Sequence, residues 1–258
     1  KKEGPVKNHK GTRVVDLPGI YSLSPYTTEE VVTRDHLIAA RPDAIINIVD
    51  ATNLERNLYL TLQLMELETP MVIALNMMDE LRSNGATVDV RQLEEALSVP
   101  VVPISATKNE GIHDLIHAAL TVAEQQLKPK KIDFCSGDLH NAIHAVSHLI
   151  ANEADAAGLP LRFCATKLVE GDPLLLARLG IKEPERDIIR HIVDDMEEHL
   201  ETDREAAMAD MRYAFIEENC SPAVKKTGES REHLHSVRID SILTHKILAL
   251  PIFLSVML

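Results

Sequence analysis

Cysteine is scarce in this chain of 258 residues, and its three cysteines, Cys135, Cys164 and Cys220, lie far apart. No two of them form a CxxC pair. This spacing excludes a disulfide framework and a cysteine-based zinc site, and it is typical of a protein in a reducing compartment.

Positive charge is also in deficit, since 27 lysines and arginines face 40 aspartates and glutamates and the formal net charge is −13. A nucleic-acid-binding protein needs a basic face, so we expect no nucleic-acid partner. The sequence also lacks a signal peptide, an internal repeat and a low-complexity tract. These absences favour a protein that faces the cytosol.

Apolar residues make up 45% of the chain, which is enough for a substantial core. Residues 1–128 alternate short β-branched runs with helical patterns, which predicts a parallel α/β sheet with right-handed crossovers. The expected strands are Arg13–Leu17, Ala44–Asp50, Met71–Asn76 and Val101–Ile104, and the expected helices are 29–40, 54–67, 89–98 and 111–126.

The strand pattern ends at the linker Lys128–Lys131, and residues 133–222 predict a small all-helical domain. Residues 223–258 begin with a polar linker and end in an apolar run at 247–258. This run is shorter than the about 20 residues that span a bilayer, so it predicts either a core segment or the start of a membrane helix. The helices expected in the middle region are 138–155, 160–180, 184–200 and 203–219, with a further one at 239–250.

The first chemical motif is Asp16, Leu17, Pro18 and Gly19, directly after the first expected strand. A carboxylate at the carboxyl end of a parallel strand can hold Mg²⁺ beside a triphosphate. Gly19 lets its backbone N–H approach a phosphate closely. Taken alone, the motif is a weak signal, and an ordinary turn after a strand is the simpler interpretation.

The second motif is Asn76, Met77, Met78 and Asp79, after the strand Met71–Asn76. The Asp79 carboxylate can accept hydrogen bonds from N1–H and the exocyclic amine of guanine, a pair of donors that adenine lacks. Asn76 is expected to tie neighbouring loops together. The alternative is that Asp79 caps a helix.

The third motif is Ser105, Ala106 and Thr107, after the last expected strand. A backbone N–H in this loop can donate to guanine O6, although a capping turn is an alternative. The three motifs in this order, each after a strand, predict a guanine-nucleotide site more strongly than any one of them.

These motifs resemble the switch-II, base-specificity and base-supporting motifs of the small-GTPase-like superfamily. The strings Val14–Leu23 and Asn47–Gln63 resemble the bacterial ferrous iron transport protein B (FeoB) family more closely, and Leu243–Phe253 resembles the start of its first membrane helix. The implied fold is a partial small-GTPase-like domain, a helical domain similar to a nucleotide-dissociation inhibitor, and the start of a membrane helix.

The resemblance implies a GTPase that controls Fe²⁺ uptake by a bacterial inner-membrane transporter, with this region on the cytoplasmic side. It implies GTP or GDP, Mg²⁺ and K⁺ as bound groups and Fe²⁺ as cargo. The implied partners are the protein's own permease domain, the membrane, small cytoplasmic Feo proteins and further copies of the chain.

The resemblance also places the glycine-rich phosphate loop and the switch-I threonine upstream of Lys1, and we expect both chain ends to be internal points of a longer protein. The fragment is therefore expected to bind GTP or GDP poorly and to be inactive, and no catalytic residue is assigned. Met77 replaces the lysine of many relatives. Ile20 follows Gly19 where Ras-like enzymes have a water-orienting glutamine, which predicts slow hydrolysis.

Two further groups could bind a metal ion: His140, His144 and His148, which share a helical face, and the acidic stretch His191–His199. A solvated polar face is the simpler interpretation of each. Two other functions remain open, a soluble ribosome- or tRNA-linked GTPase and a non-enzymatic helical docking scaffold.

Overall fold

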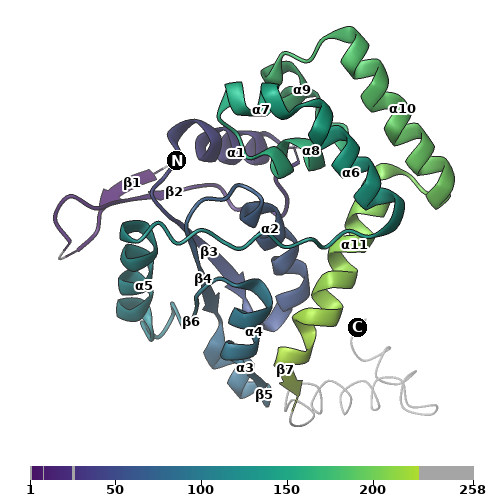
Figure 1. Ribbon diagram of the computed structural model, residues 1–258. Coiled ribbons are helices and arrows are strands. Elements are labelled where there is room, and N and C mark those ends of the chain that lie inside the picture. Colours follow the sequence, from purple (N-terminus) through teal and green to yellow (C-terminus); the bar gives the residue numbers. More distant parts are fainter. Residues whose placement is uncertain (1, 8, 25–26, 227–258) are drawn as a thin grey trace, which may run out of the picture.

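A computed structural model describes residues 2–7, 9–24 and 27–226, and it divides into an α/β part and a helical part (Figure 1). The predicted fold class is confirmed over these residues. The predicted helix 239–250 and the apolar run 247–258 lie outside the described residues. The α/β part contains β1 (Lys2–Pro5), β2 (Arg13–Asp16), α1 (Thr28–Ala40), β3 (Ile45–Asp50), α2 (Leu54–Met65), β4 (Met71–Asn76), α3 (Met78–Ser83), β5 (Ala86–Val88), α4 (Val90–Leu97), β6 (Val101–Pro103) and α5 (Ile112–Glu124).

The central sheet is parallel and has the order β3-β4-β6. Ile45 pairs with Met71, and Ile73 pairs with Val101. The first five residues of β4 are buried because helices cover both faces of this strand, which explains its unbroken apolar run. All three strands were predicted from the sequence. Their carboxyl ends lie at one edge of the sheet, where α/β proteins bind ligands.

Two further strand pairs flank this sheet. β1 and β2 form an antiparallel pair, and β5 pairs with β7 (Val224–Lys226). The pattern predicted β2 as a strand, but the prediction that it belongs to the parallel sheet is wrong, because β2 pairs antiparallel with β1. The pattern did not predict β1, β5, β7 or α3. These four elements have three to six residues each, too few for a period to show.

β3 carries two exposed isoleucines on one face. Ile46 is 37% and Ile48 is 64% exposed, whereas Ile45 and Val49 are buried on the opposite face by α2 and neighbouring side chains. β3 hydrogen-bonds to β4, while β2 hydrogen-bonds to β1. The sheet therefore has an apolar face beside β3 that no described helix covers.

The helical part contains α6 (Gly137–Leu149), α7 (Ala151–Ala157), α8 (Leu161–Val169), α9 (Pro173–Leu179), α10 (Glu183–Leu200) and α11 (Arg204–Asn219). The sequence predicted continuous helices at 138–155 and 160–180. Both predictions are wrong, because each of these regions contains two helices. Gly171 has φ +84°, and Asp172 then caps α9 by accepting hydrogen bonds from the N–H groups of Leu174 and Leu175. A glycine and a capping aspartate before Pro173 are stop and start signals, so this break was readable from the sequence.

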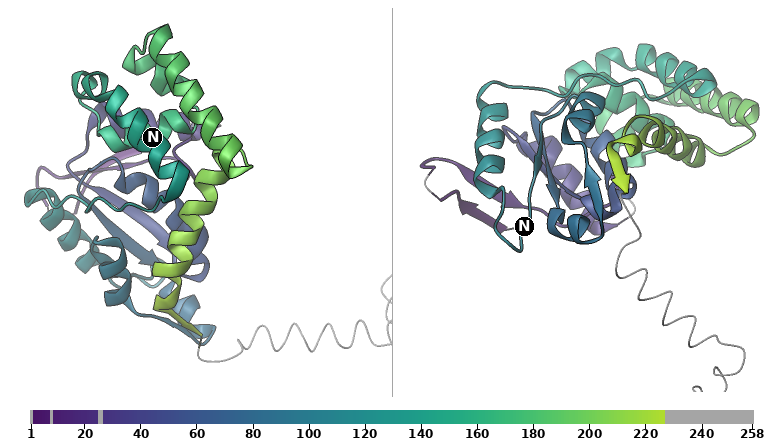
Figure 2. Two further views of the ribbon diagram at one scale, coloured as in Figure 1. Left: turned by 45° about the vertical axis from the view of Figure 1, so that its right-hand side comes forward. Right: turned by 90° about the horizontal axis from the view of Figure 1, so that it is seen from below.

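α11 carries the chain from the helical part back to the α/β part, where β7 joins β5 (Figure 2). Residues 224–226, which the sequence placed in a linker, are therefore part of a sheet. Within the described ranges, no helix has both the length and the apolarity needed to cross a bilayer.

Buried ion pairs hold the two parts together. Lys167 on α8 is 0% exposed and donates to Glu170 Oε2 at 2.7 Å. Arg212 on α11 is also 0% exposed, and its Nη1 lies 2.6 Å from Glu170 Oε1, while Nη2 lies 3.6 Å from Glu66 Oε2 of the α/β part. Thr166 donates to the other Glu66 oxygen at 3.0 Å.

The surroundings shift the pKa values in this cluster strongly. Burial opposes the charged form of Glu170, but Lys167 and Arg212 outweigh it and lower the pKa of Glu170 to about 2. Burial raises the pKa of Glu66, and Arg212 opposes that shift. Removing one member of such a cluster leaves a buried charge with neither a partner nor solvent. The loss of folding stability is therefore far larger than on breaking a surface ion pair.

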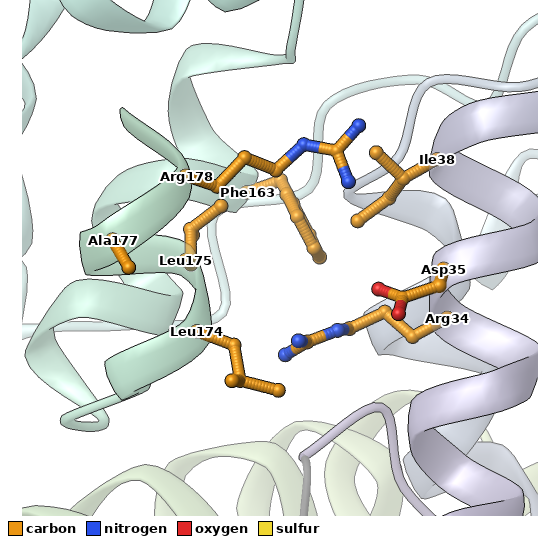
Figure 3. Close-up of a pocket in the computed structure, with 8 residues that line it drawn as sticks. All are labelled: Arg34, Asp35, Ile38, Phe163, Leu174, Leu175, Ala177 and Arg178. Atoms are coloured by element: carbon orange, nitrogen blue, oxygen red, sulfur yellow. The ribbon is translucent and has the colours of Figure 1, made fainter. Parts of the chain in front are cut away.

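A second buried ion pair, between Arg34 on α1 and Asp172 at the start of α9, also joins the α/β part to the helical part. Figure 3 shows Arg34 and Ile38 on one side of a cavity of about 400 Å³ and Phe163, Leu174 and Leu175 on the other. The Arg34–Asp172 pair thus joins α1 to the helical part beside a cavity that the surrounding side chains do not fill.

Glu170→Gln tests the buried cluster through pH. The lowered pKa of Glu170 gives stability that is present above its ordinary value of 4.5 and is lost as pH falls toward about 2. The variant should lose about 3 kcal/mol at pH 7, and its difference from wild type should shrink toward zero as pH falls below 4.

The measurement is urea unfolding at several pH values. Glu183→Gln, which removes an exposed pair with Arg186, is the control and should change stability by less than ~0.5 kcal/mol. A Glu170→Gln difference that is independent of pH would show that Glu170 contributes packing alone.

Candidate functional site

Two of the predicted motifs meet at the carboxyl edge of the central sheet. Asn76 ends β4, and its side-chain oxygen accepts the backbone N–H of Ala106 at 3.1 Å. The Met78 N–H donates to the carbonyl of Ile104 at 3.2 Å. These two contacts hold residues 76–79 against residues 104–106, and Asn76 is the side chain that ties the loops together.

Asp79 lies in the first turn of α3, but it does not cap the helix. Met77 occupies the N-cap position in the left-handed conformation, with φ 64° and no side-chain cap. The alternative interpretation of Asp79 as an N-cap is therefore wrong, because the helix starts two residues earlier than that role requires. The carboxylate is left available for another partner.

The two carboxylate oxygens of Asp79 have different surroundings. Oδ1 is buried and has no hydrogen-bond partner among the described residues. Oδ2 lies 3.5 Å from the Thr107 hydroxyl and 3.6 Å from the Lys108 ammonium. A buried acceptor without a donor is costly, so Oδ1 is available to a donor from outside the described residues.

The pKa of Asp79 is lowered, first by the nearby Ser105 hydroxyl and also by Lys108. The carboxylate is therefore negatively charged at neutral pH. A charged acceptor suits a ligand edge that presents two N–H donors side by side.

The loop after β6 is closed by its own hydrogen bonds. Ser105 and Glu110 pair as an isolated antiparallel bridge, and the Ser105 hydroxyl accepts the Lys108 N–H at 3.3 Å. Arg82 on α3 binds Glu110 at 2.7 Å. The loop that carries the third motif is thus anchored both to itself and to the helix that carries Asp79.

Asp16, Leu17, Pro18 and Gly19 lie at the end of β2, in the separate strand pair. The Asp16 side chain is exposed, and the Pro18 carbonyl accepts the Thr33 hydroxyl of α1 at 3.3 Å. A Cβ at Gly19 would meet nothing within 4 Å, so none of the described protein atoms requires a glycine at this position. The two oxygens of the exposed Asp16 carboxylate suit Mg²⁺ as ligands, but they do not form a complete Mg²⁺ site by themselves.

The other metal candidates are not assembled into sites. His144 and His148 stack edge to face with ring centroids 4.5 Å apart, and His140 binds Asp133 at 2.9 Å. Across the described residues, no group of three His, Cys, Asp or Glu side chains is placed to hold a metal ion. The acidic stretch on α10 uses Glu197 to bind Arg204 at 2.7 Å.

Sequence reasoning missed two residues that surround the predicted motifs. Lys108 lies beside Asp79, and the Arg56 guanidinium lies 4.3 Å from the ring centroid of Tyr21, shortly after Gly19. Lys108 directly follows the third motif, which was the available signal. Arg56 is far from Tyr21 in sequence and gave none.

Family models match both parts of the chain. Residues 1–119 match the family described as ferrous iron transport protein B, and residues 136–225 match the FeoB cytosolic helical domain. The chain belongs to the FeoB family.

Curated FeoB relatives match the chain over nearly its whole length. It is 38% identical over 255 residues to the Fe(2+) transport protein A/Fe(2+) transporter FeoB fusion protein of Porphyromonas gingivalis, and it is 35% identical over 253 residues to the Fe(2+) transporter FeoB of Legionella pneumophila. These matches cover 93% and 95% of the chain. The chain spans about a third of the length of these relatives, since it covers 30% and 31% of them.

Solved FeoB structures have the same fold. A mutant NFeoB from S. thermophilus bound to GDP is 40% identical with a TM-score of 0.80, and the match covers 86% of this chain and 85% of that one. An mGMPPNP-bound NFeoB from S. thermophilus is 41% identical with a TM-score of 0.76, covering 88% and 85%. These matches agree with the predicted α/β domain followed by a helical domain.

Gly111 closes the third-motif loop, and Gly111→Ala tests how tightly that loop is built. Its φ is +72°, and an added Cβ would lie 2.4 Å from the Pro103 carbonyl oxygen. We expect a loss of about 3 kcal/mol in urea unfolding, because backbone strain and a clash with backbone add.

Gly180→Ala is the matched control. Gly180 has φ +66°, but nothing lies within 4 Å of the position that its added methyl group would take, so the loss should be about 1 kcal/mol. Equal losses for the two variants would mean that the loop yields to the added methyl group.

Proposed function

We propose that this FeoB chain is the guanine-nucleotide-responsive part of a bacterial inner-membrane Fe²⁺ transporter, lying on the cytoplasmic side. The observation that carries the proposal is the buried Oδ1 of Asp79, which has no partner among the described residues and lies at the edge of the sheet where Asn76 and Ala106 join two loops. In NFeoB structures of S. thermophilus, the same fold is bound to GDP or mGMPPNP.

Asp79 selects the base in this proposal. Its two oxygens accept N1–H and the 2-amino group of guanine, and adenine has no equivalent donor pair. Met77 and Met78 lie beside the carboxylate in sequence, and an apolar methionine side chain can cover the base face without adding charge. Asn76, Ser105, Ala106 and Thr107 hold the loops in place.

Asp16 would hold Mg²⁺ beside the nucleotide phosphates, and Leu17, Pro18 and Gly19 would belong to the same phosphate-facing loop. The 258 residues contain no GxxxxGK[ST] loop, the element that supplies the main phosphate contacts in such sites, so in this proposal the chain by itself binds nucleotide weakly and is inactive. Mg²⁺ would neutralise phosphate charge, and K⁺ would supplement it. Hydrolysis is slow because the apolar Ile20 cannot orient water.

The segment after Gly19 carries the nucleotide state to the helical part. The Leu23 N–H donates to Gln63 Oε1 of α2 at 2.6 Å, and Leu23 is fully buried. Lys167 Nζ lies 3.3 Å from the same Gln63 oxygen and 3.4 Å from the Ser24 hydroxyl. A movement of residues 22–24 therefore changes the hydrogen bonds of a buried lysine on α8.

Fe²⁺ is the cargo of the transporter and not a resident metal of this region. The proposed partners are the permease domain that follows in the same protein, small cytoplasmic Feo proteins and further copies of the chain. The relatives' names support iron transport, because they are Fe(2+) transporters of which this chain covers about a third.

Asp79→Asn tests base selection and iron transport together. In vesicles that contain the full-length protein, Fe²⁺ uptake should change from dependence on GTP to dependence on XTP, because an amide can donate to the 2-oxo group of xanthine. The measurement is the initial rate of Fe²⁺ uptake with each nucleotide inside or outside the vesicle.

Asp114→Asn, at an exposed position in the first turn of α5, is the control and should keep the preference for GTP. Nucleotide titration of the 258-residue chain should give only weak binding. Uptake by Asp79→Asn that still prefers GTP would remove Asp79 from base recognition.

Lys167→Met tests the path to the helical part. In full-length protein, hydrogen exchange in α11 should differ between the GDP and GTP-analogue states, and the variant should lose most of this difference. Ser24→Ala removes only a hydroxyl next to Lys167 and should reduce the difference without unfolding the protein.

Lys131→Met is the control, because Lys131 forms an exposed ion pair with Glu68. It should retain the full nucleotide response. A full response in both Lys167→Met and Ser24→Ala would show that the signal follows another route.

A further inference from the structure

The cavity between α1 and the helical part has the features of a small-molecule site (Figure 3). Its volume of about 400 Å³ falls within the range of about 300–1,000 Å³ that ligand pockets occupy. None of its lining residues belongs to the three sequence motifs, so the proposed nucleotide site does not account for it. The lining residues come from α1, α8 and α9 and are Arg34, Asp35, Ile38, Phe163, Leu174, Leu175, Ala177 and Arg178.

Two contacts fix α1 against the helical part around this cavity. Arg34 pairs with Asp172 at the start of α9. Arg41, which ends α1 with φ 45°, donates to the carbonyl of Gly158 at 3.0 Å. The other lining residues of α1 lie between these two contacts in sequence. The cavity therefore lies where α1 is held in place, and not at a loose edge of the molecule.

One part of the cavity is apolar. Ile38, Phe163 and Leu175 are buried, whereas Leu174 is 45% exposed. Figure 3 shows Ile38 facing Phe163, Leu174 and Leu175 across the open space. An aliphatic or aromatic group placed there would lose its contact with water, which is favourable.

A buried hydrogen-bond donor at the cavity lacks an acceptor. Arg34 is only 3% exposed, and one end of its guanidinium is paired with Asp172. Its Nε has no hydrogen-bond partner among the described residues. Figure 3 shows the Arg34 side chain extending from α1 toward Leu174 along the cavity. An unpaired buried donor is costly, so an acceptor on a ligand would be stabilised here.

Opposite charges stand on different sides of the same cavity. Asp35 on α1 and Arg178 on α9 are both exposed, and neither forms an ion pair with another residue of the described ranges. Figure 3 shows the Asp35 carboxylate and the Arg178 guanidinium bordering the open space. A simple anion would be repelled by Asp35 and a simple cation by Arg178, whereas a ligand that carries both charges complements the two residues.

We propose that this cavity binds a small zwitterion with an apolar side chain, of the class of the α-amino acids with aliphatic side chains. Asp35 is the partner of its ammonium group, and Arg178 together with Nε of Arg34 is the partner of its carboxylate. The apolar side chain packs between Ile38 and Phe163. The site is separate from the proposed guanine site, so neither inference depends on the other.

The experiment is a ligand-observed NMR titration of the full-length protein in lipid nanodiscs, with L-leucine as the probe. L-leucine should bind saturably with a Kd on the order of 0.1–1 mM. 4-Methylpentanoate lacks the amino group and 3-methylbutylamine lacks the carboxylate, so each should bind about tenfold more weakly. Glycine has both charges but no apolar side chain, and it should also bind about tenfold more weakly.

Two variants assign the charges of the ligand to their partners. Asp35→Asn should weaken L-leucine about tenfold and bring it level with 4-methylpentanoate, because no charge remains to favour the amino group. Arg178→Met should bring L-leucine level with 3-methylbutylamine for the corresponding reason. Both residues are exposed, so neither change should prevent folding.

Asp43→Asn and Arg190→Met are the matched controls, because both residues are exposed and neither lines the cavity. Each control should bind L-leucine as wild type does. The inference is overturned if L-leucine does not bind saturably, or if glycine or either singly charged analogue binds wild type as tightly as L-leucine. It is also overturned if Asp35→Asn and Arg178→Met bind L-leucine no more weakly than their controls.

Discussion

The arrangement of the two parts depends on charges that have been taken out of water. Lys167, Glu170 and Arg212 are almost completely buried, and they are compensated by one another and by Glu66. Such a cluster tolerates little displacement, because a shift of one member leaves the others uncompensated in a low-dielectric surrounding. The helical part is therefore held in one orientation against α2 by electrostatics as well as by apolar packing.

This constraint makes the contacts between the α/β part and the helical part sensitive to small displacements. Gln63 accepts from the Leu23 backbone on one side and from Lys167 on the other. The Arg34–Asp172 pair joins the same two parts through α1, next to a cavity. Directional contacts and unfilled space thus occur together where α1 meets the helical part.

The sequence predicted the elements whose patterns are long and locally determined. β4 is readable because it is buried on both faces, and α1 is readable from the capping box of Thr27 and Glu30. The buried cluster was not readable, since lysine and arginine are residue types that are mostly exposed, and Lys167 and Arg212 are buried through contact with a remote part of the chain. The loops of Asn76 and Ser105 were predictable as motifs, and the predicted role of Asn76 in tying neighbouring loops together agrees with its contact to Ala106.

The pairing of β7 with β5 has a mechanical consequence. β7 forms a three-residue antiparallel ladder with β5, and β5 in turn contacts α3. A force applied to β7 would act first on β5 and then on the short helix whose first turn holds Asp79. Such a force would reach Asp79 without passing through the helical part.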